Sequence, residues 1–147
     1  MNILSKLSDT LKELMLINDL TEQTLAEQTG IPIACISVYV RGLQLPYIDT
    51  LLKLADYFKC SVDYLLGLTD NFCKKDYNYS STFLQRFNEL LVTNNCTTYK
   101  KFGINEISKS SFYEWKRGKS LPTLENLVKL AQHFNRSIDF ILGRTDY

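Results

Sequence analysis

The chain repeats itself once, and this repeat constrains the fold more than any other feature. A shift of 76 residues aligns residues 7–70 with residues 83–146 without a gap, and 20 of the 64 aligned positions are identical. Each half carries an Arg-Gly pair, a Leu-Pro pair and a Leu-x-Lys-Leu-Ala stretch at matching places. A long period that occurs only twice indicates duplicated domains, because a solenoid needs about three or more shorter units. Each copy must therefore bury a small core of its own.

The apolar residues of each copy recur at helical spacing. Leu4, Leu7, Leu11 and Leu14 recur every three or four residues, and this spacing predicts an amphipathic helix that ends near Asn18.

Residues that favour helix ends divide the rest of the first copy. Thr21 is placed to cap a short second helix, and Gly30 is placed to end it. Pro32 suits the first turn of a third helix, a fourth helix follows Pro46, and Ser61 is placed to cap a fifth.

The second copy repeats this plan, with helices expected over residues 81–92 and near residues 98, 109, 124 and 138. We therefore predict an all-α fold of two tandem five-helix domains, over residues 1–70 and 81–147. The polar segment 71–80 is predicted to be a short linker.

Composition excludes several classes of protein. The chain is 45% hydrophobic, enough for packed cores, but no apolar run approaches the ~18 residues of a membrane span. Charged residues interrupt the apolar positions near the N-terminus, so no secretory segment is predicted and a cytoplasmic location is expected. The four cysteines are far apart and form no CxxC pair, so we expect reduced thiols, no metal and no cofactor.

The two halves differ in charge. Residues 1–73 carry 5 Lys and Arg against 9 Asp and Glu, whereas residues 74–147 carry 12 against 7. If one half contacts the phosphates of a nucleic acid, it is the second.

Several short motifs resemble the lambda-repressor/Cro-like (XRE) helix-turn-helix family. They are Thr21-x-x-x-Leu25-Ala26, Gly30-Ile31, Ile36-Ser37, Arg41-Gly42, Pro46 and residues 51–55, with similar stretches at 107–118 and 122–134. The resemblance implies that double-stranded DNA is the partner. It also implies that the third helix of a copy enters the major groove, while the start of the second helix touches the backbone.

In the second copy, the resemblance places Lys109, Ser110, Tyr113 and Glu114 on the base-facing side of the third helix. Lys109 can donate to guanine O6 and N7, Ser110 can bond to either kind of edge, and Glu114 can accept from cytosine N4. These four residues are the predicted base-reading set.

Basic residues flank this helix. Lys116, Arg117 and Lys119 follow it, and Thr98 opens the preceding helix, where the resemblance implies phosphate contacts. An ordinary solvated run of charges is the alternative for the three basic residues. Phe112 and Trp115 match core positions of the first copy and are expected to be buried.

The second copy departs from the family pattern in its second helix. Lys101, Phe102 and Glu106 stand where the family has Leu, Ala and Gly, so the turn before the third helix is expected to differ. Phe102 and Ile104 are expected to repack there.

The first copy departs at the reading surface itself. Its groove-facing positions are Ile33, Ala34 and Val38, and only Ser37 and Arg41 remain for weaker contacts with DNA. We interpret the apolar face as a protein interface, since monomers rarely expose large apolar patches. Weak DNA contact, or a face covered by the linker, are the alternatives.

Two functions follow from these observations. In the first, the chain is a sequence-specific transcription regulator, a repressor by steric block, in which the second copy reads DNA and the first joins a homodimer or binds a partner. In the second, the chain is a protein-interaction module that keeps the fold without reading DNA, such as an antirepressor, an antitoxin or a mobile-element adaptor. No nucleophile motif, phosphate loop or carboxylate pair suggests an enzyme.

Overall fold

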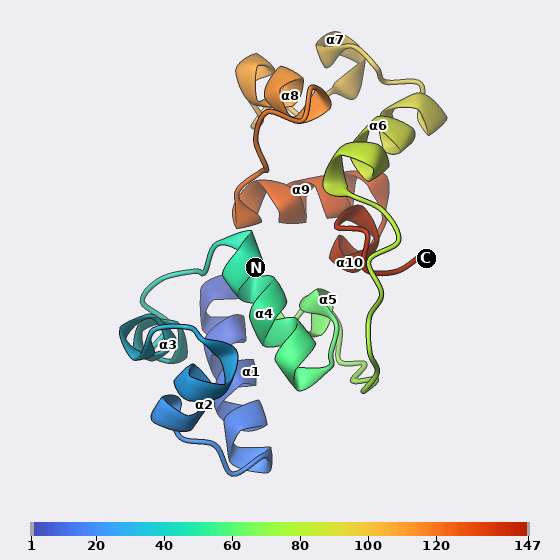
Figure 1. The fold of residues 1–147 in the computed structure, drawn as a ribbon. Coiled ribbons are helices and arrows are strands. Elements are labelled where there is room, and N and C mark those ends of the chain that lie inside the picture. Colours follow the sequence, from blue (N-terminus) through green and yellow to red (C-terminus); the bar gives the residue numbers. More distant parts are fainter. Residues whose placement is uncertain (1, 147) are drawn as a thin grey trace. The chain divides into compact units, whose positions relative to one another are not determined.

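Helices make up all the regular structure of residues 2–146, which are the residues that the computed structural model describes. The chain divides into two units, Met1–Tyr77 and Asn78–Tyr147. The first contains α1 (Ile3–Ile17), α2 (Glu22–Thr29), α3 (Ile33–Val40), α4 (Ile48–Phe58) and α5 (Val62–Leu65). The second contains α6 (Phe83–Thr93), α7 (Tyr99–Phe102), α8 (Lys109–Lys116), α9 (Leu124–Phe134) and α10 (Ile138–Ile141), as Figure 1 shows. The predicted all-α class is confirmed.

Helix caps account for the boundaries in the first unit. The side chain of Thr21 accepts a hydrogen bond from the Thr24 amide at 3.1 Å, and Ser61 does the same for Tyr64 at 3.0 Å. Gly30 ends α2 in the left-handed conformation with φ +76°. These three ends were predicted from the sequence. In the second unit, α6 begins at Phe83, two residues after the predicted start, because Thr82 caps it.

The core of the first unit is mainly aliphatic. Its helices pack through α1 against α3 and α5, and through α2 against α3 and α4. The side chains that fill this space are fully or almost fully buried: Leu7, Leu11, Leu25, Ile36, Leu51 and Leu54.

The core of the second unit adds a cluster of aromatic rings to its aliphatic side chains. The Phe87 ring lies 6.0 Å from those of Phe102 and Phe112 and 5.9 Å from that of Trp115, centroid to centroid, in edge-on contacts. Phe112 is 0% and Trp115 2% exposed, so their predicted place in the core is confirmed. Rings packed edge to face hold this core together.

The second helix of the second unit does not follow the ungapped alignment. Thr98, which aligns with Glu22, is the residue that caps α7, so the cap is shifted by one residue. Phe102 consequently takes the buried place of Leu25, four residues after the cap. Gly103 then ends α7 with φ +77°, after four residues where α2 has eight.

The turn that follows α7 is closed by apolar residues. Ile104 and Ile107 are 8% and 1% exposed, so the expected repacking of Phe102 and Ile104 is confirmed. The bulky Phe102 ring and the early glycine together explain the shorter helix.

The segment predicted as a linker packs against its own units along much of its length. The Phe72 ring lies 5.1 Å from that of Tyr64, and the Lys75 amide donates to the Lys59 carbonyl at 3.0 Å. At the other end of the segment, the Ser80 amide donates a hydrogen bond to the Gly143 carbonyl of the second unit at 2.9 Å. The contacts of the first unit lie at α5 and the end of α4, so the alternative that the linker covers α3 receives no support.

Candidate nucleic-acid interface

The exposed face of α8 carries the four residues predicted to read bases. The helix is capped by Ser108, whose hydroxyl accepts a hydrogen bond from the Ser111 amide at 3.1 Å. Because Phe112 and Trp115 point into the core, the opposite side of α8 is turned to solvent. That side holds Lys109 and Ser110, which are exposed, and Tyr113 and Glu114, which are half-buried.

The same residues line a shallow hollow of about 360 Å³, and Arg117 completes it. The hollow thus brings together two cations, two hydroxyl groups and one carboxylate. Donors and acceptors of this kind are the groups that bind base edges in the major groove. The structure therefore gathers the predicted base-reading set on one surface.

Lys116 makes contacts within the second unit. Its ammonium donates to the carbonyl oxygen of Thr97 at 2.6 Å and lies 6.0 Å from the centroid of the Phe112 ring. Lys116 therefore links α8 to the loop before α7, and its contact with a DNA phosphate stays a prediction. It lies on the half-buried side of the helix, which brings it within reach of that loop.

The start of α7 adds basic residues that sequence reasoning did not assign to the site. Thr98 is exposed and accepts a hydrogen bond from the Lys101 amide at 3.4 Å. Lys100 and Lys101 follow it and are also exposed. The excess of basic residues in the second half was the signal for them. Lys119 is exposed after the end of α8, and its amide donates to the Glu114 carbonyl at 2.8 Å.

The corresponding face in the first unit is apolar. Ile33 is 50% exposed, Ala34 is exposed and Val38 is half-buried. Leu43, 65% exposed, lies in the turn after α3, where its amide donates to the Val38 carbonyl at 2.9 Å. Leu43 extends the apolar face and was missed from the sequence. Its alignment with Lys119 was the available signal.

Ser37 and Arg41 lie together on this helix. The Arg41 guanidinium donates to the Ser37 hydroxyl through Nε at 3.2 Å and also through Nη2. The guanidinium is thus folded back along α3, and Glu22 stands half-buried in the first turn of α2. A carboxylate at that position opposes phosphate, so the first unit offers DNA little positive charge.

Residues 2–146 show neither a metal-binding cluster nor a membrane-spanning helix. No group of three or more His, Cys, Asp or Glu side chains is arranged to hold a metal ion. Within the same residues, no helix has the length and apolar character needed to cross a membrane.

Comparison with known proteins places a family match in the first unit. Residues 11–65 match the family model described as helix-turn-helix. These residues form a helix-turn-helix domain. A protein of Bacillus subtilis (strain 168), described as the uncharacterized HTH-type transcriptional regulator YobD, is 39% identical over 61 residues. The alignment covers 42% of this chain and 54% of that relative, so the chain spans about half of the relative's length.

The family match ends at residue 65 and does not extend into the second unit. No solved structure matches the chain. The likeness of the second unit to the first rests on the internal repeat and on the shared order of five helices.

Proposed function

We propose that the chain is a DNA-binding transcription regulator in which α8 and its flanks contact DNA. The helix-turn-helix at residues 11–65 and the description of its relative as a transcriptional regulator support a regulator of transcription. The observation that carries the choice of α8 is its polar, partly cationic face, at the positions where α3 is apolar.

The repeat allows the two helices to be compared position by position. Ile33 and Ala34 of α3 correspond to Lys109 and Ser110 of α8, at the offset of 76 residues. At these two positions α8 offers hydrogen-bonding side chains and α3 offers none, although sequence is read mainly through hydrogen bonds to base edges. Charge points the same way. Residues 78–147 carry 10 Lys and Arg against 6 Asp and Glu, and residues 1–77 carry 7 against 10.

A Lys109→Ala variant is expected to bind a duplex chosen by selection from a random library about 10-fold more weakly, or worse, as loss of a good base contact does. Its preference at one base pair should also relax. Fluorescence anisotropy with the selected duplex and its single-base variants measures both effects. The matched control is Lys53→Ala, a substitution of an exposed lysine on α4. Equal affinity of wild type and Lys109→Ala for every duplex would contradict a base contact by Lys109.

A second candidate is that α3 is the reading helix, and the location of the family match favours it. In that case the apolar side chains of Ile33 and Ala34 would contact thymine methyl groups, and Arg41 would contact phosphate. Arg41 and Arg117 occupy the same place after α3 and α8, so this pair distinguishes the candidates.

We also propose that the apolar face of the first unit, formed by Ile33, Ala34, Val38 and Leu43, joins two copies of the chain. Ile33 and Leu43 are exposed to an extent that favours burial against a partner. A two-fold dimer would present two α8 helices to two half-sites, spaced by about one helical turn of DNA, ~34 Å, or a multiple of it. Docking of a different protein on this face is the alternative.

An Ile33→Lys variant is expected to weaken self-association about 10-fold or more, because it places a charge at the centre of the face. Sedimentation velocity over a range of protein concentrations measures the dissociation constant. Val92→Lys, at a side chain 69% exposed on α6, is the control and should leave the dissociation constant unchanged. A wild-type chain that stays monomeric across the range would overturn the dimer and favour a different protein partner.

A further inference from the structure

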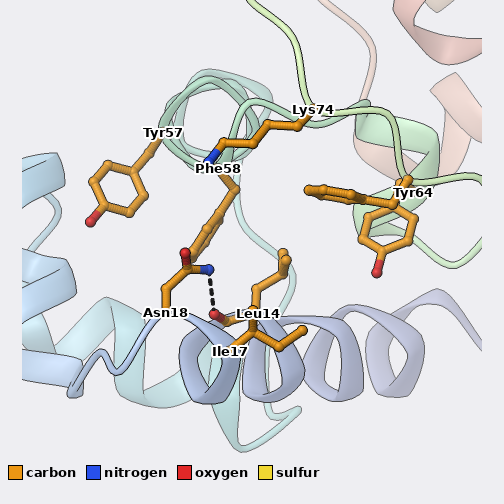
Figure 2. A pocket seen from close by; sticks show the side chains of 8 residues that line it. Leu14, Ile17, Asn18, Tyr57, Phe58, Tyr64 and Lys74 are labelled. Carbon is orange, nitrogen blue, oxygen red and sulfur yellow. Dashed lines mark hydrogen bonds between the residues drawn. The ribbon is translucent and has the colours of Figure 1, made fainter.

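The first unit contains a hollow of its own, separate from the face of α3. It has a volume of about 580 Å³, within the range of ~300–1,000 Å³ typical of small-molecule sites. Its walls come from the end of α1, the end of α4, α5 and the segment after α5, as Figure 2 shows. The lining residues are Leu14, Ile17, Asn18, Tyr57, Phe58, Tyr64, Phe72 and Lys74.

Most of this lining is apolar and aromatic. Leu14 and Phe58 belong to the core and are buried, whereas Ile17 is 68% and Phe72 45% exposed. The rings of Tyr64 and Phe72 meet edge to face, with their centroids 5.1 Å apart. Leu14 and Ile17 lie on the facing helix, α1, as Figure 2 shows. Ile17 and Phe72 therefore leave apolar surface in contact with water, and a flat apolar body between them would cover it.

The polar groups at the hollow are few. Within residues 2–146, the Lys74 ammonium forms no ion pair or hydrogen bond. The nearby carboxylate of Asp76 lies 3.4 Å from the ammonium of Lys59 instead. The amide nitrogen of Asn18 donates to the Leu14 carbonyl at 2.7 Å, which leaves its side-chain oxygen as an acceptor. The hollow thus offers one positive charge and one acceptor.

Two carboxylates, those of Glu13 and Asp70, act on the hydroxyl of Tyr64. Burial raises the pKa of Tyr64 above its usual value, and the nearby Glu13, Cys60 and Asp70 raise it further. The Tyr64 hydroxyl points away from Lys74 in Figure 2. An anionic group is therefore accommodated beside Lys74 and not beside Tyr64.

We propose that this hollow binds a small molecule with a planar aromatic body and one anionic group. The body packs against Ile17, Phe58 and Phe72, the anion pairs with Lys74, and an N–H group of the ligand donates to the Asn18 side-chain oxygen. Because Phe72 and Lys74 follow α5, the bound molecule holds this segment against the first unit. The site does not depend on DNA binding, and it stands or falls independently of the role of α8.

Two matched dyes test the site on the full chain. Both 1-anilinonaphthalene-8-sulfonate and N-phenyl-1-naphthylamine have the same aromatic body and N–H group, but only the first carries an anion. The sulfonate dye is expected to bind at one site per chain, with a fluorescence increase. Lys74→Met should weaken its binding about threefold to fivefold, as loss of an exposed ion pair does. The same variant should leave the affinity of the neutral dye unchanged.

Two further variants locate the dye. Ile17→Trp fills the hollow from its exposed rim and should abolish the binding of both dyes, with a far-UV circular dichroism spectrum like that of wild type. Lys75→Met, whose lysine stacks on Tyr77 instead of lining the hollow, should behave as wild type. Unchanged binding of the sulfonate dye in both Lys74→Met and Ile17→Trp would overturn the proposal. Loss of binding in Ile33→Lys alone would overturn it too, since the dye would then bind the face of α3.

Discussion

A Gly143→Ala variant is expected to lose more than about 4 kcal/mol of stability in the second unit, enough to unfold most domains of this size. A Cβ atom at this position would lie 1.9 Å from the carbonyl oxygen of Ser81 and 2.5 Å from its carbonyl carbon. Both atoms belong to the backbone, so no side-chain rotation relieves the overlap. The backbone of Gly143 also has φ +79°, which strains any residue with a side chain.

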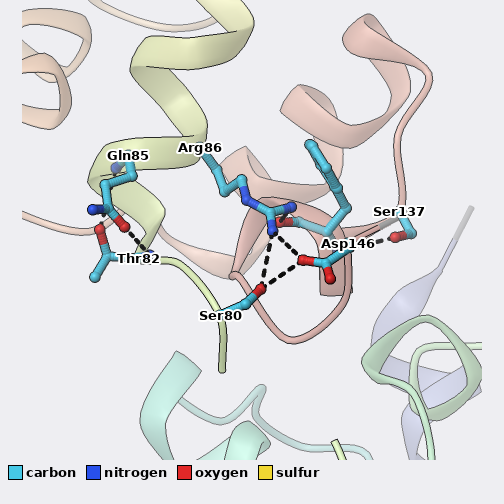
Figure 3. Close-up of polar contacts among 7 residues, drawn as sticks. Ser80, Thr82, Gln85, Arg86, Ser137 and Asp146 are labelled. Carbon is cyan, nitrogen blue, oxygen red and sulfur yellow. Dashed lines mark hydrogen bonds and ion pairs between the residues drawn. The ribbon is translucent and has the colours of Figure 1, made fainter. Parts of the chain in front are cut away.

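The backbone near Ser81 has little freedom to move away. The Ser80 amide donates to the Gly143 carbonyl at 2.9 Å, and the Ser80 hydroxyl donates to the Asp146 carboxylate at 2.7 Å. The Arg86 guanidinium donates to the Asp146 carboxylate at 3.3 Å, as Figure 3 shows, and to the Phe140 carbonyl at 3.0 Å. These bonds fix the segments before α6 and after α10 to each other.

Gly103→Ala is the control for Gly143→Ala. Gly103 has nearly the same φ, +77°, but the nearest atom to an added Cβ, the Lys101 carbonyl oxygen, would be 3.7 Å away. Its expected cost is the conformational strain alone, about 1–2 kcal/mol. Trp115 is the one tryptophan of the chain and lies in the core of the second unit, so its fluorescence during urea unfolding reports this unit. Equal losses in the two variants would contradict the overlap with Ser81.

Arg144→Leu is expected to destabilise the second unit by about 3–5 kcal/mol, because it removes the partner of a buried carboxylate. The side chains of Arg144 and Asp139 are 0% and 3% exposed, and Nη1 of the arginine donates to the carboxylate. Without the guanidinium, the charge of Asp139 remains buried with less compensation. Urea unfolding followed by Trp115 fluorescence measures the loss.

The double variant Asp139→Leu/Arg144→Leu tests the reason for this loss. Replacing both members of a buried pair by apolar residues removes the uncompensated charge, so the double variant should recover much of the stability lost in Arg144→Leu. In the first unit, Leu68 stands at the position of Arg144, and Asp63, at the position of Asp139, is half-buried. The same order of helices therefore forms without the arginine. A double variant less stable than Arg144→Leu would contradict the electrostatic account and point to lost packing.

The helix order was predictable because its signals are local. Thr21, Gly30 and Ser61 mark helix ends through bonds to residues at most four positions away, and the spacing of apolar residues fixed the buried face of α1. The base-facing side of α8 came from the resemblance to the helix-turn-helix family, and the structure places Lys109 and Tyr113, one helical turn apart, on the solvent side of the helix.

Features that depend on tertiary contacts were not predictable. Gly103 aligns with Glu27 in the ungapped repeat, so its role as the end of α7 appears only when Phe102 is placed in the core. Lys116 reads as one member of a basic run, but its bond to Thr97 depends on how two helices meet. The hollow beside Phe72 is lined by residues far apart in the sequence, so no sequence motif predicts it.

The salt dependence of binding in Arg117→Ala and Arg41→Ala distinguishes contact of DNA with α8, as proposed, from contact with α3. The measurement is the slope of log K against log salt concentration for the full chain and a selected duplex. We predict that Arg117→Ala reduces the slope by about 1, the value for one lost phosphate contact, while Arg41→Ala leaves it unchanged. A reduced slope in Arg41→Ala with an unchanged slope in Arg117→Ala would contradict the claim and assign DNA binding to the first unit.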